Sequence, residues 1–198
     1  MDSFGGLGAV HAVEVDIITD AYRISGTVQT RFGRVTDILN QVTAMHLTVE
    51  QATMREHAYP GATWTAPSAL IDLASILLLA APGLTGGASS EMRIPKRAVM
   101  AQFALPPIRV TGTIHVPMGS RPLDGLLNVT DRFLAMTDVT IASGAHPELG
   151  GTLEAVAICR ARAQILLVAD DERPDELLAD VLDERTAESW LRVDEAAR

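Results

Sequence analysis

The segment Tyr22–Asn40, YRISGTVQTRFGRVTDILN, recurs in altered form at Ile108–Asn128, IRVTGTIHVPMGSRPLDGLLN. Apolar residues fall on the same alternating faces in both segments, and the alignment continues over most of each half of the chain. An offset of 86 aligns residues 11–33 with 97–119, and later segments align at offsets of 87 and 89. The identities at offset 86 are Ala12/Ala98, Val13/Val99, Arg23/Arg109, Gly26/Gly112, Thr27/Thr113 and Gly33/Gly119. The sequence therefore predicts an internal duplication.

Each copy has the pattern of a β-rich unit. Val13, Val15 and Ile17 alternate with acidic residues, which is the period of a half-buried strand. A glycine interrupts the next strand of each copy, at Gly26 and Gly112, as is typical where a strand bends or bulges in a small curled sheet. A connection around Gly33 then leads to a third predicted strand.

The apolar segment Leu70–Ala81, LIDLASILLLAA, fits either a buried helix or two short strands when it is read alone. Its counterpart in the second copy is Cys159–Asp170, CRARAQILLVAD, whose apolar spacing favours two strands joined by a tight turn. We therefore predict strands for both segments. An offset of 89 aligns Ile76-Leu77-Leu78 with Ile165-Leu166-Leu167.

The expected domain organisation follows the two copies. Residues 12–81 form a first unit, residues 82–96 a linker rich in Gly and Ser, and residues 97–169 a second unit. Residues 171–198 are predicted to form an acidic helix with an apolar stripe. This helix either packs on the second unit or docks on a partner protein.

Composition narrows the class of protein. The net charge is -9, of which residues 170–198 contribute -7 from 11 acidic and 4 basic residues, so the body is nearly neutral. The rest of the chain, being nearly neutral, provides no broad positively charged surface for binding nucleic acid. The longest apolar run, residues 69–81, is shorter than the roughly 20 residues that a membrane helix needs. No cationic leader precedes an apolar run at the N-terminus, and the single Cys159 fits a reducing compartment. We expect a soluble, cytoplasmic protein.

The second copy also resembles a known fold family. Val110–Ile114 (VTGTI) looks like the central strand of the first Sm motif. Val156–Arg160 (VAICR) followed by Ile165–Val168 (ILLV) looks like the strand pair of the second motif. An R-x-x-D motif followed by Leu-Asn occurs in both copies and is similar to an uncharacterised bacterial Sm-like family. The resemblance to Sm, LSm and Hfq proteins covers residues 12–81 and 97–169. It implies a mainly β protein made of two tandem five-stranded Sm-like (SH3-like) barrels, followed here by the C-terminal α-helix.

Candidate ligand or RNA contacts come from this motif and from the second Sm-like strand pair. They are Arg34, Asp37, Asn40, Arg121, Asp124, Asn128, Arg160 and Arg162. The arginines at 34 and 121 could instead pair with the aspartates three residues later, which would pin the loop without any ligand. RNA-binding Sm proteins carry an Arg-Gly pair in the second motif, and this chain has none there. The five histidines lack metal-ligand spacing, and no catalytic or cofactor motif occurs, so we expect no enzyme activity, metal or cofactor.

Two function classes remain open. The first is a non-catalytic assembly or adaptor protein. Its units would associate through the apolar edge strands ILLLAA and ILLVAD into a homo-oligomeric ring or dimer of tandem units. The second is an RNA-binding Sm-like ring. In Sm proteins the corresponding strands pair between subunits to close a ring, so the resemblance implies a homo-oligomer in either case.

Overall fold

The computed structural model describes residues 9–41, 43, 45–84, 96–118, 122–127 and 130–168. The predicted acidic helix 171–198 and residues 85–95 of the predicted linker lie outside the described residues. The described chain is almost entirely β-structure, as predicted, and its two short helices, α1 and α2, have six residues each. Among the described residues, no helix is long and apolar enough to cross a membrane.

The elements of the first half are β1 (His11–Thr19), β2 (Tyr22–Thr30), α1 (Val35–Asn40), β3 (His46–Glu56), β4 (Thr63–Asp72) and β5 (Ile76–Ala80). Those of the second half are β6 (Lys96–Leu105), β7 (Ile108–Pro117), α2 (Pro122–Leu127), β8 (Phe133–Ala142), β9 (Gly151–Cys159) and β10 (Ile165–Val168). The short 3-10 turns η2 (Pro147–Leu149) and η3 (Arg160–Arg162) flank β9.

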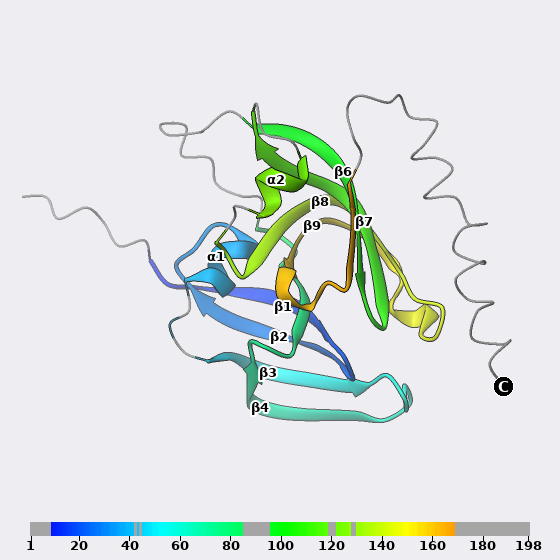
Figure 1. Cartoon of the computed structure of the whole chain (residues 1–198). Helices are drawn as coiled ribbons and strands as arrows, with labels where there is room; N and C mark the ends of the chain where they lie inside the picture. Colours follow the sequence, from blue (N-terminus) through cyan, green and yellow to red (C-terminus); the bar gives the residue numbers. More distant parts are fainter. Residues whose placement is uncertain are drawn as a thin grey trace, which may run out of the picture.

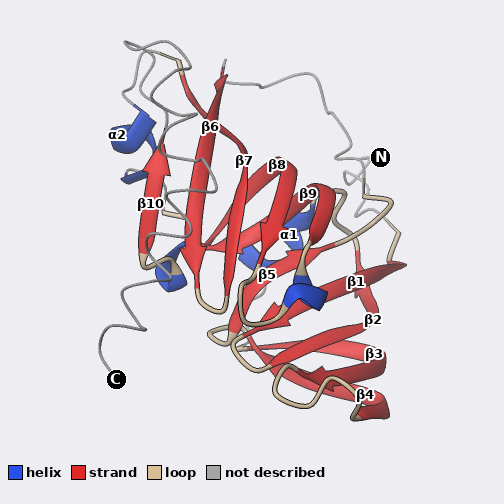
Figure 2. Ribbon diagram, turned by 90° about the vertical axis from the view of Figure 1, so that its right-hand side faces the viewer, coloured by secondary structure: helices blue, strands red, loops and turns tan. Residues whose placement is uncertain are grey.

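All ten strands belong to one antiparallel sheet in the order β10-β6-β7-β8-β9-β5-β1-β2-β3-β4. The strand order of the first half, β5-β1-β2-β3-β4, is therefore repeated in the second half as β10-β6-β7-β8-β9. Figure 1 places β1–β4 in the lower part of the molecule and β6–β9 in the upper part. Figure 2 shows the sheet turning steadily from β10 at one end to β4 at the other.

The structure differs from the predicted pair of five-stranded barrels, because its ten strands form one sheet that is not closed into a barrel. The sheet is a linear series with two ends, β10 and β4, and it does not close on itself. The reason lies in β5, whose neighbours are β1 on one side and β9 of the second half on the other. Because β9 takes the edge of β5, the first five strands cannot close among themselves, and the two halves form one continuous sheet.

The continuous apolar run of β5 follows from its position at this junction. Leu79 and Ala81 pack into a first core, which residues 13–81 mostly build, whereas Leu78 and Ala80 pack into a second core, which residues 99–158 mostly build. All five residues of β5 are buried. A strand that is buried on both faces has no polar alternation, which is why the sequence of this segment also fitted a helix. The structure confirms the two-strand prediction.

Both halves contain a bulge at the same point. The β2–β3 register shifts between Ser25 and Thr27, and the β7–β8 register shifts between Thr111 and Thr113. The residues across from these shifts, Gln51 and Asp138, adopt the left-handed backbone conformation with φ of 50° and 53°. A bulge bends its strand and increases the local twist, so each half curves at its central glycine, Gly26 or Gly112, as the sequence indicated.

The segments that carry the R-x-x-D motif contain short helices where the sequence analysis had a loop. In α1 the apolar residues Val35, Ile38 and Leu39 lie three and four positions apart, share one helix face and are buried in the first core. The expectation of a plain loop rested on Gly33 and overlooked this spacing. Because this face is buried, α1 fixes the positions of the polar residues of the motif.

Candidate functional site

Asn40, a predicted ligand contact, binds the backbone of the other half of the protein. Its Nδ2 donates to the carbonyl oxygen of Phe133 at 2.9 Å, and its Oδ1 accepts from the Phe133 N–H at 2.9 Å. Phe133 begins β8 and its ring packs into the first core. The side chain therefore acts as a short extension of the sheet that ties α1 to β8, and both of its polar atoms are used within the fold.

The two predicted arginines of the second half also bond within the chain. Arg160 Nη1 donates to the carbonyl oxygen of Leu126 at 3.1 Å, which fixes the end of α2. Arg162 donates to the carbonyl oxygen of Ala74 at 3.2 Å and forms an ion pair with Asp20. Both of these acceptors belong to the first half, so Arg162 bridges the two halves.

The remaining predicted contacts do not form a common site. Arg34 precedes α1 and is exposed, Asp37 lies in the first turn of α1, and Asp124 is exposed on α2. Arg34 and Asp37, which the structure describes in full, form no ion pair with each other, although an ion pair between them was one of the sequence readings. Arg121 and Asn128 lie outside the described residues.

The junction between the halves is formed by three cross-strand pairs of β5 and β9: Leu78 with Ile158, Leu79 with Ala157, and Ala80 with Val156. The pairing registers also give the correspondence between the halves. Leu79 lies opposite Ile17 in the first half and Leu166 lies opposite Phe103 in the second, so Leu79 and Leu166 are equivalent at an offset of 87. The offset of 89 suggested by the letters Ile-Leu-Leu is therefore wrong by two residues, a shift that preserves the faces of the strand.

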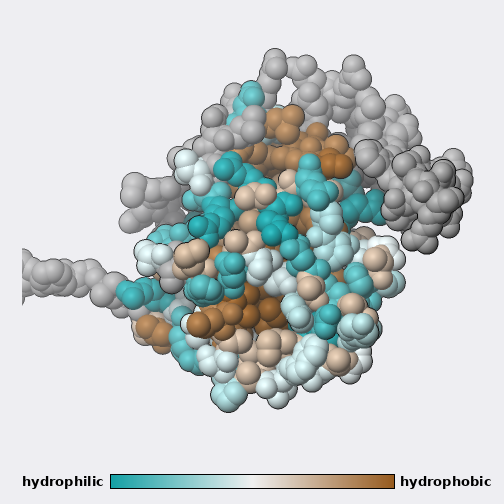
Figure 3. Space-filling model, turned by 60° about the horizontal axis from the view of Figure 1, so that its bottom comes forward, coloured by the Kyte–Doolittle hydropathy of each residue, from teal (hydrophilic) through white to brown (hydrophobic). Residues whose placement is uncertain are grey.

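The two ends of the sheet carry apolar side chains that the junction would bury. Leu78 is 1% exposed in β5, whereas its equivalent Ile165 is 42% exposed in β10, and Ala80 at 2% corresponds to Leu167 at 38%. At the other end, Leu70 of β4 is 68% exposed, and its equivalent in β9 is the fully buried Ala157. Figure 3 views the molecule from the side of β3 and β4 and shows apolar residues reaching this surface. In the described chain, no strand pairs with the outer edge of β4 or β10.

The edge strand β4 has limited protection against pairing. Pro67 lies across from the bulge residue Gln51, between the pairs Glu50–Ser68 and Ala52–Ala66. Proline is tolerated on edge strands and at bulges because it lacks the N–H that a ladder requires. The segment Ala69–Ile71 beyond it is apolar and contains no charge, and β10 consists of four apolar residues. Natural edge strands usually carry charges or are covered, so both ends are candidate association sites.

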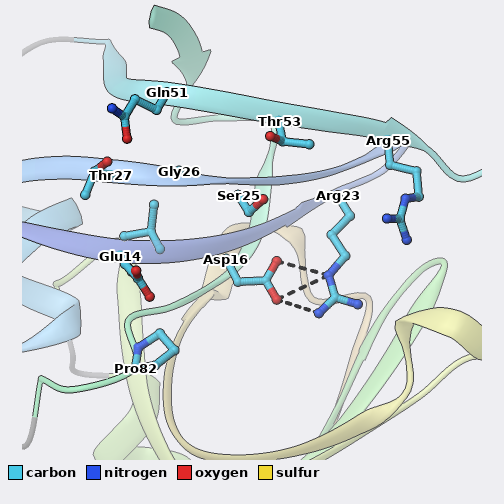
Figure 4. A pocket seen from close by; sticks show the side chains of 11 residues that line it. Glu14, Asp16, Arg23, Ser25, Gly26, Thr27, Gln51, Thr53, Arg55 and Pro82 are labelled. Atoms are coloured by element: carbon cyan, nitrogen blue, oxygen red, sulfur yellow. Dashed lines mark hydrogen bonds and ion pairs between the residues drawn. The ribbon is translucent and has the colours of Figure 1, made fainter. Parts of the chain in front are cut away.

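A separate pocket lies on the face of β1, β2 and β3 that points away from the first core (Figure 4). Its volume is about 720 Å³, and eight of its eleven lining residues are polar or charged. Arg23 lies in its wall, and its Nε and Nη2 donate to the carboxylate of Asp16 at 2.6 to 3.2 Å. Its Nη1 donates to the carbonyl oxygen of Glu148, a residue of the second half, at 3.2 Å. None of the predicted contact residues lines this pocket, and sequence reasoning missed it.

Two groups in the described chain have a shifted pKa. The hydrogen bonds that Arg23 donates to Asp16 raise the pKa of Arg23 above its ordinary value, against the lowering effect of partial burial, and the charge of Asp16 adds to the increase. Burial raises the pKa of the Cys159 thiol, which is 2% exposed. A buried thiol with a raised pKa is a poor nucleophile, and Cys159 packs in the first core as a small apolar residue.

No group of three or more metal-binding side chains comes together within the described ranges of the chain. Comparison with known proteins gives no match to a family model, to a curated protein or to a solved structure.

Proposed function

We propose that this protein is a non-catalytic assembly module that associates with copies of itself through the two free ends of its sheet. The observation that carries the proposal is the β5–β9 junction, where the chain already makes such a contact between its own halves. In the proposed assembly, β4 of one copy pairs antiparallel with β10 of the next, as β9 pairs with β5 inside each copy.

The equivalence of the halves specifies the register of this contact. The β5–β9 pairs can be transferred to the ends of the sheet by adding 87 to each β5 residue number and subtracting 87 from each β9 residue number. This predicts three pairs between copies. These are Ile71 with Ile165, Leu70 with Leu166, and Ala69 with Leu167. All six residues are apolar, so every pair would add hydrophobic contact as well as main-chain hydrogen bonds.

Internal duplication is part of the proposal. It is supported by the six identities at an offset of 86, by the repeated strand order, and by the bulges at the equivalent residues Gln51 and Asp138. A more specific proposal is that each of the two halves is an Sm-like unit. It is supported by the five-stranded organisation of each half and by the residue likeness of Val110–Ile114. In Sm proteins the corresponding strands pair between subunits, which is the arrangement proposed for β4 and β10.

A contact between two different ends is heterologous, so successive copies form a closed ring if the rotation closes and an open filament if it does not. The chain mass is 21.1 kDa. We expect light scattering across the micromolar range to give discrete multiples of this mass. A monomer throughout this range would contradict the proposal.

Edge variants with a matched control test the position of the contact. Leu70→Lys on β4 and Ile165→Lys on β10 should each weaken association at least about tenfold, because a lysine would be buried in an apolar contact. The control is Met100→Lys. Met100 is 42% exposed, like Ile165, but its equivalent Glu14 stays exposed beside the internal junction. Equal effects of the control and edge variants would show that association occurs elsewhere.

The alternative of an RNA-binding ring receives little support from the described contacts. Asn40, Arg160 and Arg162 direct donors at the protein backbone or at Asp20, so fewer groups remain for bases and phosphates. Filter binding with oligo-U and oligo-A at low and moderate salt separates the two functions, since phosphate contacts weaken steeply with salt. Salt-dependent binding of either oligonucleotide would favour the RNA-binding ring.

A further inference from the structure

The pocket on β1–β3 contains two arginines that lie directly opposite each other. Arg23 on β2 and Arg55 on β3 are cross-strand partners, and both line the pocket. Like charges in this relationship are destabilising. Asp16 compensates one of them by accepting hydrogen bonds from Arg23, while Arg55 has no hydrogen-bond or ion-pair partner among the described residues. Within the described part of the chain the exposed Arg55 therefore forms no ion pair, and the unpaired carboxylate in the pocket lining is that of Glu14 on β1.

Two hydroxyl groups lie on the same face of the sheet as the charge of Arg55. Ser25 and Thr53 are also cross-strand partners, two residues along the same strands from Arg23 and Arg55, and thus on the same face of the sheet. Figure 4 shows both side chains between the Asp16–Arg23 pair and the Gln51 side chain. Neither hydroxyl makes a hydrogen bond to another described residue. A guanidinium and two hydroxyls thus offer free donors on the same face of the pocket.

The second half of the chain shows that the fold does not require this arrangement. The positions equivalent to Asp16 and Arg55 are Gln102 and Ala142. Gln102 Nε2 donates to the hydroxyl of Thr111 at 3.3 Å, which satisfies the polar groups locally and leaves no second cation. The sheet forms in both halves, so the arginine pair and its free donors are specific to the first half.

The position and size of the pocket suit a small ligand. Its volume of about 720 Å³ lies within the range of small-molecule sites. The bond from Arg23 to the carbonyl oxygen of Glu148 links the pocket wall to the turn before β9, so the second half helps to fix the orientation of Arg23. Arginine presents a planar fork of donors that matches the oxygens of a carboxylate or phosphate.

We propose that this pocket binds the oxyanion group of a small carboxylate or phosphate ligand. Arg55 supplies the charge-assisted hydrogen bonds, Thr53 and Ser25 add hydroxyl donors, and the Asp16–Arg23 pair forms a fixed wall beside them. The site lies within one chain and does not depend on association through β4 and β10. The edge variant Leu70→Lys should therefore bind the same ligands as the unaltered protein.

Isothermal titration at constant ionic strength, with inorganic phosphate and succinate as separate probes, tests the proposal. The full chain should bind at least one probe, and the tighter one identifies the class of oxyanion. Arg55→Gln should weaken binding roughly tenfold or more, since a charged hydrogen bond is lost, and Thr53→Val should weaken it by a smaller factor. Arg31→Gln, which changes an exposed arginine outside the pocket, should leave binding unchanged.

Circular dichroism of each variant would establish that it is folded before binding is measured. Binding of neither probe by the unaltered protein would overturn the proposal. Equal binding by Arg55→Gln and the unaltered protein would also overturn it, as would an equal loss in Arg55→Gln and Arg31→Gln.

Discussion

Asn40 and Phe133, 93 positions apart in the chain, are joined by two hydrogen bonds of 2.9 Å between the Asn40 amide and the Phe133 backbone. The two bonds use one donor and one acceptor on each side, as in a pair of neighbouring strands. They connect α1 of the first half to the first residue of β8 in the second half. The contact shows how closely the two halves depend on one another.

Replacement of Asn40 should therefore lower the stability of the whole chain. Asn40→Ala leaves the N–H and carbonyl of Phe133 without partners, and we expect a loss of about 1–3 kcal/mol in the free energy of unfolding. Asn40→Asp keeps the acceptor but loses the donor, so it should also destabilise. The measurement is urea unfolding, with Gln41→Ala on the exposed neighbouring residue as control. A change under about 0.5 kcal/mol in Asn40→Ala would mean that the two bonds contribute little.

The central glycines should be the least replaceable residues of the two bulges. A Cβ added at Gly26 would lie 2.6 Å from the carbonyl oxygen of Glu50, and one added at Gly112 would lie 2.7 Å from that of Thr137. We expect Gly26→Ala and Gly112→Ala each to lower the free energy of unfolding by about 1–3 kcal/mol, because the backbone must shift.

Gly61→Ala is the matched control, since nothing lies within 4 Å of the added Cβ. Thermal unfolding of the three variants checks the prediction. If Gly61→Ala destabilised the protein as much as the other two, close packing at the bulges would not be the cause.

Cys159 should make stability fall at alkaline pH. Burial raises the pKa of its thiol in the folded protein, so above the unfolded pKa of about 8.5 the unfolded chain binds fewer protons than the folded one. The free energy of unfolding then decreases as pH rises, by at most about 1.4 kcal/mol per pH unit from this group. Comparison with Cys159→Ala between pH 8 and 10 isolates the effect. A slope that is unchanged in the variant would show that Cys159 does not contribute to it.

The sequence predicted the strands better than their assembly. Alternation along β1 and the likeness between the halves were enough to predict most of the strands, including β5. The strand predicted from Leu70 is only the end of β4, which already begins at Thr63. Two barrels were predicted in place of one sheet, because the apolar run of β5 shows only that both of its faces are buried. It does not show that β9, about 80 positions away, supplies the neighbouring edge. Pairing between distant strands leaves no local signal in a single sequence.

The candidate site was harder to predict for a related reason. Asn40 was singled out as a ligand contact because it recurs in the R-x-x-D segments, and Arg162 because it lies in the second Sm-like strand pair. Both instead bond within the chain, to Phe133 and to Ala74 and Asp20. Arg23 and Arg55 lie on polar strand faces, where a single arginine carries no functional signal in the sequence. Only the β2–β3 register brings them opposite each other. The sequence hinted at this site only through the opposite charges of Asp16 and Arg23 in the first two predicted strands.

The register of the contact between copies is the most direct test of the central claim. In a Cys159→Ala background, the pair Leu70→Cys with Leu166→Cys should form disulfides between copies under mild oxidation, because opposite residues on neighbouring antiparallel strands approach to within about 5.5 Å. The two positions lie at opposite ends of the sheet within one chain. The control pair, Leu70→Cys with Leu167→Cys, is shifted by one residue and faces the other side. We predict a ladder of covalent multimers on non-reducing gels for the first pair and none for the second. Cross-linking of the control pair, or of neither pair, would contradict the account.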